Sequence, residues 1–230
     1  MKNICVITAR GGSKRIPRKN IKDFLGKPII AYSIELAIES RLFEEVMVST
    51  DDEEIANVAK SFGAKVPFLR SAENANDYAG TFEVLKEVMG RYKKIGQSFN
   101  YLCCLYPTAP FVQKETLQRT YDLLKKRCYH TVFPVCKYST PIQRALKIVN
   151  DRIEMFSPEN RYKRSQDLEQ AYYDVGQFYW LDVSKMDKEG QLYSSKSGFV
   201  VLDEKLVQDI DTPEDWEFAE LKYKLINEFS

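Results

Sequence analysis

Short apolar runs alternate along this chain with longer segments in which apolar residues recur every three or four positions. The short runs are rich in β-branched and aromatic residues, as buried strands are, and they lie at residues 4–9, 45–50, 64–68, 99–106 and 130–136. The periodic segments predict helices, which are centred on residues 28–38, 55–62, 85–92 and 117–124. We therefore expect an α/β fold, doubly wound, with a mainly parallel sheet covered by helices on both faces.

Local signals place the starts of two of these helices. Pro28 stands at the first turn of the earliest one, where proline fits best. Residues 50–53 have the form of a capping box that begins at Thr50. Asp51 and Asp52 lie inside this box, where acidic side chains favour a helix N-terminus whether or not they touch a ligand.

The pattern changes between residues 137 and 173. This stretch is rich in Tyr, Arg, Gln and Pro, and it holds one weak strand-like piece at residues 145–149 and no long helical period. A stretch of this length without a regular core is usually functional or an interaction surface. We expect a single domain of residues 1–230 in which residues 137–173 form an excursion that packs on a partner subunit. Apolar segments return at 176–181 and 198–202, separated by a polar connector.

The loop after the first strand, residues 9–20, is basic and contains two glycines. Gly11 and Gly12 allow backbone conformations that point successive N–H groups into one concavity, which can bind phosphate oxygens. No acidic residue precedes Asp23. The glycines are surrounded by cations and one hydroxyl, from Arg10, Ser13, Lys14, Arg15, Arg18 and Lys19.

A run of basic residues is usually a solvated turn. This one directly follows a strand, at the place where open α/β sheets bind ligands. It contains neither the G-x-x-x-x-G-K-[ST] pattern of a P-loop nor G-x-G-x-x-G. We expect it to be a different kind of phosphate loop that binds a multiply charged anion such as a triphosphate.

A second polar feature lies near the C-terminus. In an extended segment, the alternation of Asp209, Ile210 and Asp211 places both carboxylates on one side and turns the isoleucine into the core. Thr212 as N-cap and Asp215 as its partner three residues later anchor the start of a following helix. Two carboxylates, together with ligand phosphates and water, supply the oxygen ligands that Mg²⁺ prefers. Asp209 and Asp211 are the predicted metal ligands.

Composition excludes several classes of protein. The 230 residues are 44% hydrophobic, enough for a large core, and a formal net charge of +1 argues against a dedicated nucleic-acid binder. No apolar stretch approaches the ~20 residues that span a bilayer, and no signal peptide is present, so we expect a cytoplasmic protein. The five cysteines form no C-x-x-C pair and are expected to be reduced. A single histidine, His130, excludes a histidine-based zinc site, so any metal takes oxygen ligands.

Five motifs occur in order over nearly the whole chain: Ala9-Arg-Gly-Gly-Ser-Lys-x-x-Pro-x-Lys-Asn20, Ser49-Thr-Asp51, Arg70 with Ala79 and Thr81, Pro107-Thr-Ala-Pro110, and Asp209-Ile-Asp-Thr212. Together they resemble the motifs of the acylneuraminate cytidylyltransferases, which make CMP-activated nonulosonic acids. Each motif alone is weak evidence, but five at compatible spacing argue against a chance match.

The resemblance implies a Rossmann-like nucleotidyltransferase fold, CTP as a substrate and Mg²⁺ as a cofactor. The residues that it assigns to the CTP phosphates and their loop are Arg10, Gly11, Gly12, Ser13, Lys14, Lys19 and Asn20. Those that it assigns to cytosine and ribose are Arg70, Ala79 and Thr81. Mg²⁺ would lie on Asp209 and Asp211, and the candidate catalytic residues are these two aspartates with Arg10 and Lys14.

The implied reaction transfers CMP from CTP to the anomeric hydroxyl of a nine-carbon sugar acid. Sialic acid synthetases carry Gln before the Pro-Thr-Ser/Ala-Pro turn, whereas this chain has Tyr106, which points away from N-acetylneuraminate. Residues 103–111, 141–146, 164–167 and 174–180 are similar to those of family members that act on pseudaminic acid. Pseudaminic acid is therefore the expected acceptor, with N-acetylneuraminate and legionaminate as alternatives, and a non-catalytic nucleotide-binding module as a remote alternative.

The predicted acceptor-binding residues are Tyr106, Arg144, Arg164, Gln177 and Tyr179. For Arg144 and Arg164, a solvated arginine or one at a subunit interface is an equally good interpretation. The resemblance also implies a homodimer joined through the excursion. No partner nucleic acid or membrane is expected.

Overall fold

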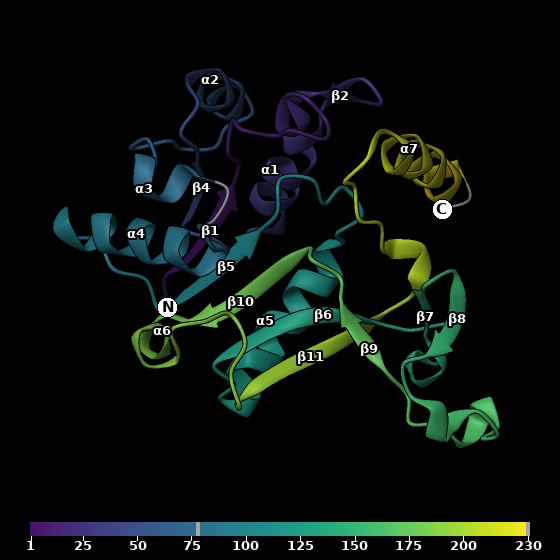
Figure 1. The fold of residues 1–230 in the computed structure, drawn as a ribbon. Coiled ribbons are helices and arrows are strands. Elements are labelled where there is room, and N and C mark those ends of the chain that lie inside the picture. Colours follow the sequence, from purple (N-terminus) through teal and green to yellow (C-terminus); the bar gives the residue numbers. More distant parts are fainter. Residues whose placement is uncertain (77–78, 229–230) are drawn as a thin grey trace.

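The computed structural model describes residues 1–76 and 79–228, and a seven-stranded sheet lies at its centre (Figure 1). Six strands follow the order β11-β6-β10-β5-β1-β4, and β9 pairs with the end of β6. The strands of this sheet are β1 (Asn3–Thr8), β4 (Glu45–Ser49), β5 (Tyr101–Leu105), β6 (Thr131–Lys137), β9 (Tyr172–Asp174), β10 (Phe178–Asp182) and β11 (Ser197–Leu202).

Five of the seven strands in this sheet, β1, β4, β5, β6 and β11, run in the same direction, and β9 and β10 run in the opposite one. Both β4 and β5 pair in parallel with β1, and β11 pairs in parallel with β6. Strand β10 lies antiparallel between β5 and β6, and β9 is antiparallel to β6. The expected mainly parallel sheet is confirmed. The carboxyl ends of β1, β4 and β5 meet at one edge, which is where such sheets bind ligands.

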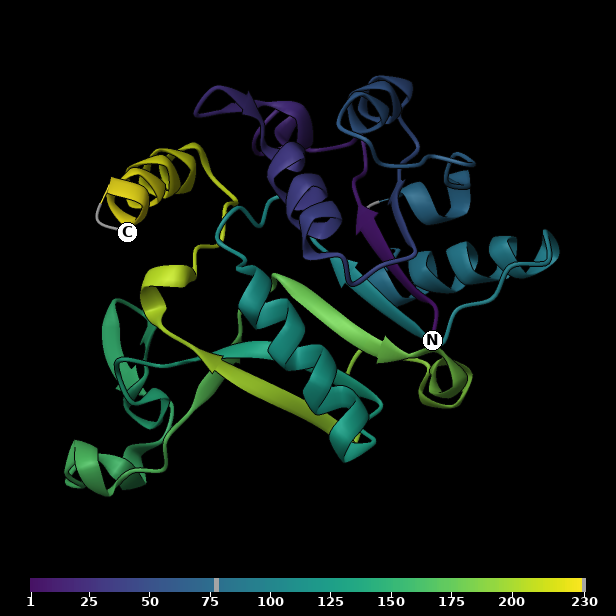
Figure 2. The same ribbon diagram turned by 180° about the vertical axis from the view of Figure 1, so that it is seen from behind.

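Helices cover both faces of the sheet, as the opposite views in Figure 1 and Figure 2 show. They are α1 (Ile29–Ser40), α2 (Glu53–Ser61), α3 (Ala72–Ala75), α4 (Thr81–Lys94), α5 (Lys114–Arg127), α6 (Val183–Glu189) and α7 (Pro213–Glu228). Residues of α1, α2 and α5 pack in one core cluster, and residues of α4 and α6 pack in another. The fold is therefore doubly wound, as expected.

Strand β1 lies between these two clusters. Its Cys5 and Ile7 side chains belong to the cluster with α1, α2 and α5, while Ile4 and Val6 belong to the cluster with α4 and α6. All four side chains are fully buried. Complete burial of an aliphatic side chain contributes about 1.5–3 kcal/mol. This two-sided packing fixes the end of β1, and with it the start of the basic loop.

The C-terminal helix α7 packs beside the small ribbon of β2 (Asp23–Phe24) and β3 (Lys27–Pro28). The ring of Phe24 meets the rings of Trp216 and Tyr223 edge to face, at centroid distances of 5.5 and 5.7 Å. Ile210 is buried in the same cluster, as expected from its alternation with two aspartates. This packing holds the segment of the two aspartates beside the basic loop.

Residues 137–173 leave the sheet at the end of β6 and return through β9, where Lys137 pairs with Tyr172. Between them lie the antiparallel hairpin of β7 (Leu146–Val149) and β8 (Arg152–Met155) and 3-10 turns over Ile142–Arg144, Pro158–Asn160 and Ser165–Asp167. The hairpin and these turns extend away from the sheet in Figure 1. Strand β7 confirms the strand-like piece expected at 145–149, while the excursion's subunit role stays a prediction.

Some local predictions were wrong. Helix α2 begins at Glu53 and is capped by Asp52, whose side chain accepts a hydrogen bond from the Ile55 amide at 3.0 Å, so Thr50 is not its N-cap. The strand expected at 64–68 is reduced to a single parallel bridge between Lys65 and Met47. This segment is too short to form a ladder of backbone hydrogen bonds with a neighbouring strand, and Pro67 has no backbone N–H to donate.

Two further segments differ from expectation. The polar connector between the last two strands contains helix α6, which Asp182 caps by accepting a hydrogen bond from the Ser184 amide. Pro28 immediately precedes α1 as its N-cap and does not lie within its first turn. Within residues 1–76 and 79–228, no helix is both long and apolar enough to cross a membrane.

Candidate active site

Two adjoining cavities lie at the carboxyl edge of the sheet. The first has a volume of about 320 Å³ and is lined by residues from β1, the basic loop, the start of α4 and the turn after β5. The second has a volume of about 920 Å³ and is lined by residues around β9, by the segment that precedes α7 and by α7 itself. Both cavities share Lys19, Tyr106, Thr108 and Asp211. A ligand in one cavity therefore lies next to a ligand in the other.

The basic loop is closed on itself by Asn20. Its side-chain amide donates a hydrogen bond to the Arg10 carbonyl at 2.9 Å, and the asparagine is buried. This contact agrees with the loop-closing role that the resemblance implies. The hydrogen bond joins the two ends of the loop, and the loop held in this way has Arg10 and Lys14 on the wall of the first cavity.

Gly11 makes structural contacts in addition to the phosphate binding expected of both glycines, which stays a prediction. Neither Gly11 nor Gly12 is among the residues with positive φ, whereas Arg18 is left-handed at φ 55°. The Gly11 amide donates to Asp51 Oδ1 at 3.0 Å, and a Cβ on Gly11 would lie 2.8 Å from Asp52 Oδ2. Gly11 is thus required for the close approach of the loop to the start of α2. Neither glycine lines the cavity.

Arg18 fastens the loop to the same helix. Its guanidinium donates to both oxygens of Asp52, at 2.5 and 3.0 Å, and also pairs with Glu54. The hydrogen bond from Arg18 is the main cause that lowers the pKa of Asp52 to about 2, and the same pairing raises the pKa of Arg18. The loop is therefore held to α2 by charged hydrogen bonds on the side away from the cavity.

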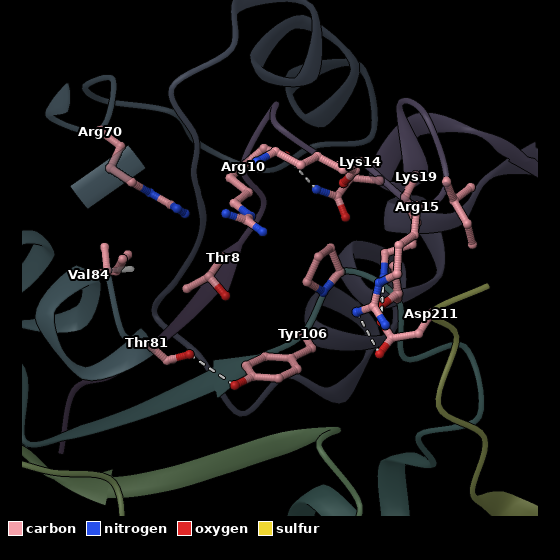
Figure 3. A pocket seen from close by; sticks show the side chains of 16 residues that line it. Thr8, Arg10, Lys14, Arg15, Lys19, Arg70, Thr81, Val84, Tyr106 and Asp211 are labelled. Atoms are coloured by element: carbon pink, nitrogen blue, oxygen red, sulfur yellow. Dashed lines mark hydrogen bonds and ion pairs between the residues drawn. The ribbon is translucent and has the colours of Figure 1, made fainter. Parts of the chain in front are cut away.

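One end of the first cavity is formed by Arg70, Thr81 and Tyr106 (Figure 3). Arg70 is buried, and its guanidinium donates to the Ser49 carbonyl at 2.5 Å and to the Ser49 hydroxyl at 3.1 Å. The Tyr106 and Thr81 hydroxyls are hydrogen-bonded at 3.0 Å. Burial raises the pKa of Tyr106 to about 12, so its hydroxyl stays neutral at physiological pH. This end offers neutral hydrogen-bonding groups and one desolvated cation.

Arg15, Lys19 and Asp211 lie together at the other end of the cavity (Figure 3). Arg15 Nη2 lies 2.8 Å from Asp211 Oδ2, and Lys19 Nζ lies 3.3 Å from Asp211 Oδ1. Among its described lining residues, the first cavity has one carboxylate, that of Asp211, and cations from Arg10, Lys14, Arg15, Lys19 and Arg70. Such an excess of cations is suited to a polyphosphate.

Asp209 and Asp211 both line the second cavity, and Asp211 also lines the first. Partial burial raises the pKa of Asp209, and the negative charge of Asp211 raises it further. Thr212 Oγ1 accepts from the Asp215 amide at 3.2 Å, and Asp215 Oδ2 accepts from the Thr212 amide at 2.8 Å, so the expected capping pair is present.

No group of three or more His, Cys, Asp or Glu side chains suited to a metal ion occurs within the described ranges. A site of two carboxylates fits a metal that also takes oxygens from bound phosphates and from water, as Mg²⁺ does. The structural observation that fits such a metal is that the Asp209 and Asp211 side chains line the same cavity, so two carboxylate donors face one space.

The structure places some of the predicted acceptor-binding residues at the second cavity and others away from it. Tyr106 and Gln177 line the second cavity, and the Tyr106 amide donates to the Gln177 carbonyl at 2.9 Å. Tyr179 is buried, and its hydroxyl donates to Asp174 Oδ2 at 2.5 Å, while Asp174 itself lines the cavity. Burial and the nearby Asp174 raise the pKa of Tyr179. Tyr179 therefore supports the cavity wall from behind.

Arg144 and Arg164 line neither of these cavities. Arg144 donates to the Lys163 carbonyl at 2.9 Å, and Arg164 makes a two-point pair with Asp167 at 2.7 and 3.1 Å. Within this subunit, both arginines organise the excursion. Their role toward an acceptor stays a prediction.

Several lining residues were not predicted as ligand-binding residues. Those of the first cavity include Thr8, Val84 and Thr108, and those of the second include Asp174, Asp203, Glu204 and Lys222. Thr8 and Thr108 follow the rule that residues at the ends of parallel strands face the ligand edge, so the sequence held a signal for them. Lys222 carried no such signal, because its position depends on how α7 packs.

The comparisons with known proteins agree with this geometry. The family model described as cytidylyltransferase matches residues 4–225. The chain is 44% identical over 229 residues to the pseudaminic acid cytidylyltransferase of Campylobacter jejuni serotype O:2, covering 99% of each chain. It is 30% identical over 234 residues to the CMP-N,N'-diacetyllegionaminic acid synthase of Legionella pneumophila, again covering 99% of each.

A solved structure of CMP:2-keto-3-deoxy-manno-octonic acid synthetase complexed with CTP shares the fold. The TM-score is 0.70 with 20% sequence identity, and the match covers 99% of this chain and 100% of that one. With the family model matching nearly the whole length, and with its motif residues gathered at one edge of the sheet, the chain belongs to the cytidylyltransferase family.

Proposed function

We propose that this protein transfers CMP from CTP to the anomeric hydroxyl of a nine-carbon sugar acid, pseudaminic acid, and releases pyrophosphate. The observation that carries the proposal is the pair of adjoining cavities that share Lys19, Tyr106 and Asp211. One is lined by cations and the other by carboxylates and hydrogen-bonding groups, as expected for a triphosphate beside a polyhydroxylated acceptor. The 44% identity to a pseudaminic acid cytidylyltransferase supports the choice of acceptor.

In this proposal, CTP occupies the first cavity. Arg70 and Ala79 contact cytosine and Thr81 contacts the ribose, while the triphosphate extends toward the basic loop. Arg10, Ser13 and Lys14 bind its oxygens, and all three line the cavity. The distribution of side chains supports this direction, because Arg15 and Lys19 of the loop lie at the end opposite to Arg70 and Thr81, while Arg10 lies nearer to Arg70 (Figure 3).

Asp209 and Asp211 would hold Mg²⁺, together with phosphate oxygens and water. When bound, the metal would neutralise phosphate charge and lower the pKa of the acceptor hydroxyl. The protein's own contribution is to position the two substrates and to supply fixed positive charge around the reacting phosphate. The acceptor oxygen forms a bond to the α-phosphorus while the bond from that phosphorus to the pyrophosphate oxygen breaks.

The acceptor occupies the second cavity in this proposal, against Tyr106 and Gln177. Tyr179 keeps Asp174 in place at the cavity wall through the hydrogen bond between them. N-acetylneuraminate and legionaminate are the alternative acceptors, because the relative from Legionella pneumophila is named for the second of these sugars.

We also propose a homodimer joined through residues 137–173. Large apolar side chains on the hairpin are strongly exposed, with Ile148 at 79% and Ile153 at 71%. The two isoleucines are directly paired across β7 and β8, so they form one apolar patch. Arg144 and Arg164 belong to the same excursion, and contact with an acceptor would depend on this assembly. All five cysteines are free, which fits a reducing compartment, and we propose the cytoplasm.

The proposal is tested by measuring pyrophosphate release and CTP binding on the same preparations. Wild-type protein with CTP, Mg²⁺ and a nine-carbon sugar acid should release pyrophosphate, and Asp209→Ala should lower the rate on the order of 10²-fold or more. Replacement of Glu115, an exposed acidic residue in the first turn of α5, by alanine is the control and should change neither quantity. CTP binding without pyrophosphate release from any such acid would instead favour the non-catalytic module.

A further inference from the structure

Both oxygens of Asp211 are engaged by cations of the basic loop. Arg15 Nη2 lies 2.8 Å from Oδ2, and Lys19 Nζ lies 3.3 Å from Oδ1. Figure 3 shows the Arg15 side chain reaching to Asp211 at the end of the first cavity. A divalent cation on Asp211 would lie beside these two positive charges and repel them, which favours release of one of the two side chains.

The two cations are held differently. The Lys19 side chain is 20% exposed, and its Nζ also donates to the Ile210 carbonyl at 2.7 Å, so it is tied to the backbone of the aspartate segment. The Arg15 side chain is 65% exposed, and its described ion pair is with Asp211. Exposed ion pairs contribute little to stability, because water competes for both partners. Of the two cations, Arg15 is therefore the one that is released from Asp211 more readily.

An arginine released at this point lies beside the expected position of the triphosphate. Arg15 lines the first cavity and is part of the same loop as Arg10 and Lys14. Its guanidinium can donate two parallel hydrogen bonds to phosphate oxygens. Moving from one carboxylate to a triphosphate exchanges a partner of one negative charge for a partner of several.

We propose that Arg15 is a further nucleotide-binding residue, which Asp211 holds until a divalent cation takes its place. The Arg15 guanidinium would leave Asp211 when that carboxylate holds a cation, and would then bind the triphosphate. Metal binding and nucleotide binding are thereby coupled through one side chain. This inference rests on the proposed function, because it assumes CTP and Mg²⁺ as the ligands.

A purely structural role for the pair makes a different prediction. If Arg15 only fastened the loop to the segment before α7, its loss would loosen the site equally with and without metal. If Arg15 instead exchanges Asp211 for the triphosphate when metal binds, which we call the exchange, it contributes to CTP affinity mainly when metal is present. The metal dependence of the Arg15→Ala effect therefore separates the two roles.

The experiment is a titration of CTP by calorimetry, in EDTA and in Mg²⁺, with no acceptor present. Arg15→Ala should weaken CTP binding about 10-fold or more in Mg²⁺ and less than about 3-fold in EDTA, and Arg15→Lys should fall between it and wild type. Arg127→Ala, which removes an exposed arginine of α5 outside both cavities, is the charge-matched control and should match wild type. Thermal unfolding of each variant checks that it is folded.

A second arm uses Asp211→Ala as the background. Because nothing then holds Arg15 back, adding Arg15→Ala should weaken CTP binding in EDTA by more than it does in the wild-type background. Equal losses with and without Mg²⁺, in both backgrounds, would overturn the exchange. Unchanged CTP affinity in every Arg15→Ala comparison would overturn any nucleotide-binding role. If wild-type protein binds no CTP under either condition, the proposed function itself fails.

Discussion

Lys19 is the residue that joins the two ends of the sequence at the site. Its amino group donates to the Ile210 carbonyl at 2.7 Å and contacts Asp211 at 3.3 Å, although these residues lie more than 190 positions further along the chain. It also lines both cavities. One cation thus orients the predicted metal segment and faces the position where the two substrates would meet.

Replacing Lys19 by methionine keeps much of the side chain's length and removes its charge and its donors. We expect kcat/KM to fall on the order of 10²-fold, by analogy with loss of a single group that stabilises the transition state. Steady-state kinetics with CTP and acceptor measure the effect, and Lys114→Met, on an exposed lysine of α5, is the control. Activity within about twofold of wild type would contradict the role given to Lys19.

At the residue scale, the sequence predicted which residues lie at the site better than it predicted the contacts that each of them makes. Asn20 was expected to close the loop and does so through the Arg10 carbonyl. The contact of Gly11 with Asp51 could not be predicted from local pattern, because it depends on β4 lying next to β1. The environment of Arg144 depends in the same way on how the excursion folds.

At the scale of elements, the N-terminus of α2 is both a cap and an anchor for the basic loop. Asp52 accepts from the Ile55 amide and from Arg18, and its pKa is lowered to about 2. A carboxylate with a folded pKa below its unfolded value stabilises the protein above the unfolded pKa. That contribution is lost as the pH falls through the folded pKa.

We therefore expect Asp52→Asn to flatten the dependence of stability on pH in the acid range. Between about pH 5 and about pH 2, wild type should lose about 1 to 2 kcal/mol of unfolding free energy more than the variant does, after allowance for solvent screening. Urea unfolding at a series of pH values measures this difference. Parallel curves for the two proteins would show that Asp52 does not act through its charge.

The order of helices and strands followed from apolar periodicity, but strand direction did not. Strand β10 is almost wholly buried between β5 and β6, so its sequence resembles that of a parallel central strand although it runs antiparallel. Helix α6 was read as a polar connector because its seven residues, of which Met186 is buried, are too few for a helical period.

At the scale of the whole molecule, the excursion carries large apolar side chains that the rest of this chain leaves exposed. Ile148 and Ile153 form a cross-strand pair whose side chains are mostly exposed. The sequence indicated an excursion through the absence of a regular core in residues 137–173. It could not indicate which surface would cover the hairpin in the proposed dimer, because that depends on contacts outside this chain.

We expect the double substitution Ile148→Asp with Ile153→Asp to convert the proposed dimer to a monomer, because charges in an apolar interface lose their hydration without gaining a partner. Sedimentation velocity measures the change in mass. Lys147→Ala, which removes an exposed pair with Glu154 on the same hairpin, is the control and should remain dimeric. A wild-type protein that sediments as a monomer would contradict the proposed assembly.

The acceptor is the central claim, and a direct comparison of acids tests it. The measurement is the rate of pyrophosphate release with CTP and Mg²⁺, in parallel reactions with pseudaminic, legionaminic and N-acetylneuraminic acids, each repeated with Asp211→Ala. We predict turnover with pseudaminic acid, little with the other two, and loss of turnover in the variant. Preferential turnover of N-acetylneuraminic or legionaminic acid would contradict the acceptor assigned through Tyr106 and Gln177.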